Sequence, residues 1–89
     1  MNAASSHREC DSNYRGVAIN IDPNWRVIAC RDGIQWILQQ KRGEKRGQPR
    51  FEARGYFRTR KALIRLCRNL IPTISHDALA ALEGLPERI

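Results

Sequence analysis

Residues 50–70 constrain the fold most strongly, because the spacing of apolar side chains changes within this stretch. From Phe51 to Phe57 every second residue is small or apolar, and the residues between them are mostly arginine. This alternation predicts a β-strand with one buried face and one wet, cationic face. From residue 60 to 70 the apolar positions follow helical spacing, and Thr59 is a suitable N-cap. The predicted helix must pack on the apolar face of the strand.

Three further β-strands are predicted upstream, each bounded by turn-forming residues. Pro23 lies in the first turn and an Asp-Gly pair at 32–33 forms the second. The third connection, residues 41–49, contains two glycines and a proline, and predicts a flexible hairpin tip. The four predicted strands are residues 14–21, 25–30, 34–40 and 50–58.

The C-terminal part predicts a second, shorter helix. Pro72 ends the first helix, Ser75 caps the second, and Gly84 marks its end. The predicted fold class is therefore α+β: an antiparallel meander of three to four strands, with one face packed by a C-terminal helix and a second short helix after it (ββββαα). Residues 1–13 are predicted to form a flexible N-terminal arm, and residues 14–89 are predicted to form a single small domain.

The positive charge of this chain is concentrated in one stretch. Between Lys41 and Arg68 eleven Lys/Arg and two acidic residues give a net +9, whereas the remaining five basic and seven acidic residues give −2. The sum is the formal +7 of the whole chain. Such an arrangement is typical of a protein that binds a polyanion. The alternative is a solvated face that only keeps the protein in solution.

The sheet face away from the helix is expected to be open, since antiparallel sheets can leave one face wet. Arginine can pair with guanine and glutamine with adenine, a β-sheet can enter the major groove, and a tyrosine ring could stack. Basic residues at the helix start, beside its free N–H groups, predict a phosphate seat, and those of the hairpin tip would straddle the phosphate backbone. Ordinary polar surface and snorkelling side chains are the alternatives. The predicted nucleic-acid-binding residues are Arg26, Gln35, Gln39, Lys41, Arg42, Lys45, Arg46, Arg50, Arg54, Tyr56, Arg58, Arg60, Lys61 and Arg65.

Catalysis, cofactors and metal binding are not expected. His7 and His76 are the only histidines, and neither lies in a catalytic or zinc-ligand pattern. The three cysteines, an odd number without CxxC spacing, favour free thiols in a reducing cytoplasm. The first ten residues lack the apolar core of a signal peptide, and no run approaches the roughly 18 apolar residues of a membrane span.

The run Gly55-Tyr56-Phe57-Arg58-Thr59-Arg60-Lys61-Ala62-Leu63, after a tryptophan-bearing hairpin, resembles the sheet-plus-helix arm-binding domains of phage integrases. Plant ethylene-response-type DNA-binding domains share that architecture. The resemblance covers residues 25–71 and implies a sheet laid in the major groove. The extra first strand and second helix depart from it. The strands and basic helix start are also similar to the second half of double-stranded-RNA-binding domains, which begin with a helix that residues 1–24 do not supply.

The expected function is nucleic-acid binding, with duplex DNA favoured over RNA, through the open sheet face and the start of the first helix. The segment 34–39 and the later arginine-rich strand are also similar to small uncharacterised proteins of bacterial mobile elements. That likeness keeps a second hypothesis open: a protein-interaction module or inhibitor, as anti-CRISPR proteins are, docking its basic face on an acidic or RNA-bearing partner.

Overall fold

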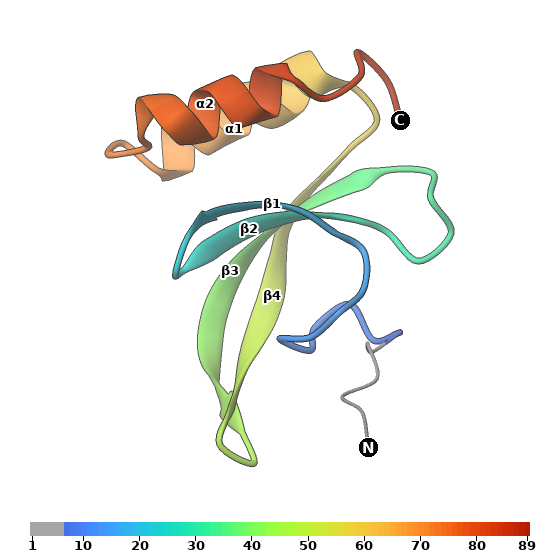
Figure 1. The fold of residues 1–89 in the computed structure, drawn as a ribbon, viewed down its shortest axis with the longest axis vertical. Helices are drawn as coiled ribbons and strands as arrows, with labels where there is room; N and C mark the ends of the chain where they lie inside the picture. The colour runs from blue at the N-terminus through green and yellow to red at the C-terminus, as the bar shows by residue number, and fades with distance from the viewer. Residues whose placement is uncertain (1–6) are drawn as a thin grey trace.

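The computed structural model describes residues 7–89; residues 1–6 lie outside the described part of the chain. Its centre is an antiparallel four-stranded sheet in the order β1-β2-β3-β4, followed by two helices (Figure 1). The predicted α+β fold and its ββββαα order are confirmed. The elements are β1 (Val17–Asp22), β2 (Trp25–Ala29), β3 (Trp36–Lys45), β4 (Gln48–Phe57), α1 (Arg60–Leu70) and α2 (His76–Glu83).

Local chemistry sets the ends of several elements. The carboxylate of Asp22 accepts hydrogen bonds from the backbone N–H groups of Asn24 and Trp25, which closes the β1–β2 turn. The hydroxyl groups of Thr59 and Ser75 accept from the N–H groups three residues later and so cap α1 and α2, as predicted.

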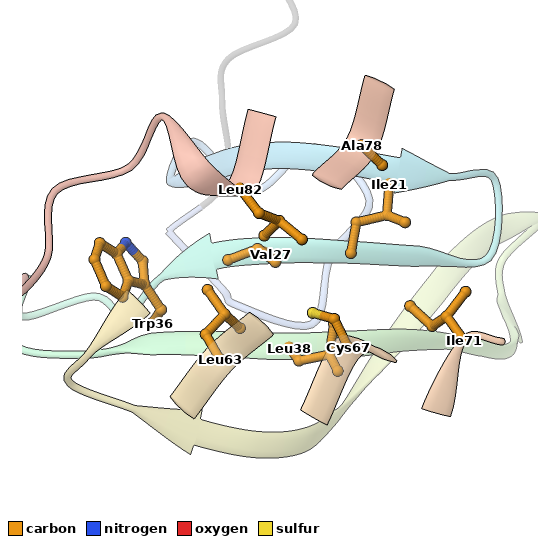
Figure 2. Packing of buried hydrophobic residues seen from close by; sticks show 9 residues of the cluster. All are labelled: Ile21, Val27, Trp36, Leu38, Leu63, Cys67, Ile71, Ala78 and Leu82. Carbon is orange, nitrogen blue, oxygen red and sulfur yellow. The ribbon is translucent and has the colours of Figure 1, made fainter. Parts of the chain in front are cut away.

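Both helices cover one face of the sheet, and the main core lies between these layers (Figure 2). Val27 of β2 and Leu38 of β3 are fully buried there. The helices contribute aliphatic side chains and one thiol to the same cluster: Leu63, Cys67, Ile71, Ala78 and Leu82. None of the helices among the described residues is long and apolar enough to cross a membrane.

Gly55 lets α1 approach the sheet closely. A Cβ atom at this position would lie 2.7 Å from Leu66 Cδ2 and 2.7 Å from Phe57 Cζ. Any larger residue must therefore displace the Leu66 side chain or the Phe57 ring.

The predicted flexible tip at 41–49 is wrong, because regular structure continues through most of it. β3 runs on to Lys45, β4 begins at Gln48, and these two residues pair. The turn between them uses positive φ angles at Arg46 (55°) and Gly47 (78°), as a tight two-residue hairpin requires. The two strands therefore form a defined β-ribbon.

Because of a β-bulge in β4, the side chains of its first half lie on the opposite face of the sheet from the predicted one. Leu38 pairs with Gly55 and Gln39 with Ala53, so that Arg54 is the extra residue on β4. Gly55 and Phe57 face the helices, whereas Ala53 belongs to a cluster on the other face. The prediction that Phe51, Ala53, Gly55 and Phe57 share one apolar face is wrong, because the period of two breaks at the bulge.

The second face of the sheet is covered by the segment 9–16, which crosses it from the edge of β4 to the edge of β1. Cys10 O accepts a hydrogen bond from Phe51 N at one edge, and Gly16 O accepts from Ala29 N at the other. Between them Tyr14 is buried and donates its hydroxyl proton to Ala29 O over 2.7 Å. The sequence predicts a flexible arm through residue 13, but residues 9–12 are tied to the sheet.

Candidate nucleic-acid interface

Arg26 holds the covering segment 9–16 against the sheet. It is 2 % exposed, and its guanidinium lies 3.8 Å from the centre of the Phe51 ring. Arg26 Nε donates to Gln39 Oε1 over 2.7 Å. The other guanidinium nitrogens donate to the backbone oxygens of Glu9, Asp11 and Ser12 over 2.8–3.1 Å.

This network corrects two predicted interface residues. Arg26 and Gln39 were expected on an open face, but both are 2 % exposed, and Gln39 Nε2 also donates to Glu9 O. Burial lowers the pKa of Arg26, and nearby Cys10 and Asp11 act against that shift. Neither side chain can read a base while the segment stays in place.

A two-stranded ribbon extends beyond this covered sheet. The pairing of β2 with β3 ends at Trp25 and Gln40, so that residues 41–51, here called the ribbon, contain only β3, β4 and their turn. It projects from the body at the end opposite the helices (Figure 1). The ribbon carries one acidic residue, Glu44, and five basic residues: Lys41, Arg42, Lys45, Arg46 and Arg50.

A polar hollow of about 590 Å³ lies between the ribbon and the N-terminal segment. Arg50 is held beside it by the isolated bridge to Asp11 and by donating to Cys10 Sγ over 3.0 Å. The hollow brings together three predicted residues and Arg8, which was not among the predicted ones. No local pattern marks Arg8, since it joins the others only through the path of segment 9–16. The lining residues are Arg8, Asp11, Ser12, Asn13, Lys45, Arg46, Gln48, Pro49 and Arg50.

The chain itself occupies part of the predicted phosphate seat at the start of α1. Arg60 N donates to Glu87 O, and Ala62 N to the Thr59 hydroxyl. The Arg60 side chain donates to Glu83 O and Leu85 O at the end of α2, over 3.1 and 2.8 Å. Arg60 therefore joins the two helices, and its side chain is bound there rather than open to a phosphate. Lys61 remains exposed beside this junction.

The remaining predicted residues are dispersed. Arg54, at the bulge, donates to Gln40 Oε1 and lies 5.9 Å from the centre of the Trp25 ring, on the helix side of the sheet. Tyr56 pairs with Ile37, which belongs to the opposite face, so that Arg54 and Tyr56 do not form one surface. Arg58 and Arg65 are exposed, and Gln35 is half-buried.

No group of three potential metal ligands comes together within residues 7–89. Neither a protein-family model, a curated protein nor a solved structure matches this chain.

Proposed function

We propose that this protein binds duplex DNA through the ribbon. The observation that carries the proposal is a projecting two-stranded element with five basic side chains and a single carboxylate. The major groove of B-DNA is about 12 Å wide and admits a two-stranded β-ribbon. Proteins that read DNA with β-ribbons use this geometry.

The hollow beside the ribbon supplies a seat for the phosphate backbone in this proposal. Arg8, Lys45, Arg46 and Arg50 oppose one carboxylate there, Asp11. Ser12, Asn13 and Gln48 add uncharged polar groups of the kind that contact phosphate oxygens. The ribbon would enter the groove, and this basic wall would face an adjacent backbone.

Duplex RNA fits this arrangement less well. The major groove of A-form RNA is deep and narrow, and side chains cannot read it. The proposal therefore predicts tighter binding to duplex DNA than to duplex RNA of the same sequence. It is a binding function without a catalytic step, and the three free cysteines suit a reducing compartment such as the cytoplasm.

The test is a fluorescence-anisotropy titration of labelled random-sequence duplex DNA with a ribbon variant, Arg42→Ala with Arg46→Gly. Both side chains are exposed, and glycine accepts the positive φ of residue 46 without strain. Removing two phosphate contacts should weaken binding to all sequences alike, by about tenfold or more.

The matched control is Arg65→Ala with Arg68→Ala, which removes the same charge from the exposed side of α1. Its affinity should stay within about twofold of the original protein, because net charge alone is a small term at physiological salt. Equal losses in both variants, or no binding of the original protein at low salt, would reject the ribbon as the interface.

A further inference from the structure

A second surface gathers around Arg58, at the other end of the molecule from the ribbon tip. Three large apolar side chains are exposed among residues 7–89: Ile34 (50 %), Tyr56 (59 %) and Ile89 (38 %). Two of them adjoin Arg58, and the third is close to it in sequence. Ile34 and Ile89 line one hollow with it, Ile89 N donates to Arg58 O, and Tyr56 precedes Arg58 by two residues.

This surface, here called the Arg58 patch, consists of Ile34, Tyr56, Arg58, Arg88 and Ile89. Its hollow measures about 230 Å³, below the usual size of a small-molecule pocket, roughly 300–1,000 Å³. The hollow suits a single side chain better than a metabolite. Exposed apolar groups gathered beside arginine are typical of protein–protein contact sites, where tyrosine and arginine are among the residues that contribute most to the binding energy.

We propose that the Arg58 patch binds an acidic peptide segment of a partner protein that carries an aliphatic or aromatic side chain beside its carboxylates. Arg58 and Arg88 supply two guanidinium groups for those carboxylates. Ile34 and Ile89 provide the apolar seat. A neighbouring hollow shares Arg88 and is lined by Lys61 and Arg60 together with one carboxylate, Glu87, so that basic side chains outnumber acidic ones beyond the patch.

Nucleic acid explains this surface less well than a peptide does. Two isoleucines offer nothing to a phosphate backbone, and the patch lies at the far end of β4 from the ribbon tip. With a rise of about 3.3 Å per residue, the strand from Gln48 to Phe57 spans roughly 30 Å. The two surfaces can therefore be occupied together, and the protein would hold a partner beside its DNA.

The test is a titration of ¹⁵N-labelled protein with a short synthetic peptide in which glutamate alternates with leucine and phenylalanine, followed by NMR. Amide shifts should concentrate at residues 34, 56, 58, 88 and 89. A second peptide with serine in place of leucine and phenylalanine should bind at least tenfold more weakly, because the apolar seat stays empty.

Arg58→Ala and Ile34→Ser should each weaken the first peptide about tenfold, and Arg42→Ala, on the ribbon, should not change it. Shifts that map to the ribbon, equal binding of both peptides, or no shift at millimolar peptide would each overturn the proposal. It would also fail if Arg58→Ala reduced duplex-DNA affinity as much as the ribbon variant does. The outcomes of the peptide titrations do not depend on whether the ribbon binds DNA.

Discussion

Arg26 holds a positive charge where almost no water reaches it, at 2 % exposure. A buried charge is costly unless other groups replace its hydration. Here three backbone oxygens, the side-chain oxygen of Gln39 and the face of the Phe51 ring take that place. The residue thus connects three strands to the covering segment, and its role is structural rather than one of DNA contact.

Replacing Arg26 by Met keeps much of its volume and removes the donor from Gln39 Oε1 and Ser12 O, whereas Glu9 O and Asp11 O still accept from Gln39 Nε2 and Tyr14 N. Arg26→Met should lower the free energy of unfolding by about 3 kcal/mol, measured by urea denaturation. Arg26→Lys should recover only part of the loss, because an ammonium group lacks the planar fork that reaches several acceptors. The control Arg15→Met, at an exposed position, should change it by less than about 0.5 kcal/mol. An equally small change for Arg26→Met would refute this role.

Cys67 gives the protein a pH-dependent stability in the alkaline range. Burial raises the pKa of its thiol from 9.0 to about 11. The unfolded chain therefore loses this proton first as the pH rises, so that stability is fully present below pH 9.0 and is lost between there and about pH 11. Urea unfolding at several pH values should show this decline, and Cys67→Ala should flatten it. An unchanged slope in the variant would assign the decline to other groups.

At the scale of elements, the start of α1 shows a basic side chain used for packing. The Arg60 guanidinium binds carbonyl groups near the C-terminus of α2, where a cation also complements the helix dipole. The resulting link holds the two helices together.

Arg60→Ala should lower the free energy of unfolding by about 1–2 kcal/mol, through the lost hydrogen bonds and the lost dipole interaction. The affinity of the folded variant for duplex DNA should remain that of the original protein. Lys61 is one residue further on and exposed, and Lys61→Ala should leave the free energy of unfolding unchanged. Both variants are measured by urea denaturation. If Arg60→Ala lowered the affinity for duplex DNA, the result would support a phosphate contact at this helix start.

The sequence predicted elements whose signals are local. Thr59, Ser75 and the helical apolar spacing located both helices, and Asp22 with Pro23 located the first turn. It did not predict the bulge at Arg54, because the alternation of residues 50–58 reads the same with or without an extra residue. Nor did it predict the ribbon, since a run rich in glycine and charge fits both a loop and a twisted hairpin.

Only part of the candidate site could be predicted from the sequence, because the tertiary structure decides which basic residues come together. Lys45, Arg46 and Arg50 do come together, because neighbouring positions on a hairpin stay neighbours. Arg26 and Gln39 do not join them, since the segment 9–16 covers that face, and its polar composition gave no sign of packing. Tyr14, which is buried and holds this segment against the sheet, was predicted only as the first residue of the strand 14–21.

At the scale of the whole molecule, the basic stretch between residues 41 and 68 is divided between two ends. The ribbon occupies one end of the 37 Å long axis, and α1 and the Arg58 patch lie toward the other (Figure 1). The rest of the sheet is covered on both faces, by helices and by segment 9–16. The body thus separates two surfaces of different chemistry.

The measurement that tests the central claim most directly is the dependence of duplex-DNA affinity on salt concentration. About six phosphate contacts predict a slope near −5 for the logarithm of the association constant against the logarithm of salt concentration. The ribbon variant Arg42→Ala with Arg46→Gly should reduce the magnitude of that slope by about two. A slope that stays near −5 in the variant, or an affinity of the original protein that does not change with salt, would contradict binding through the ribbon.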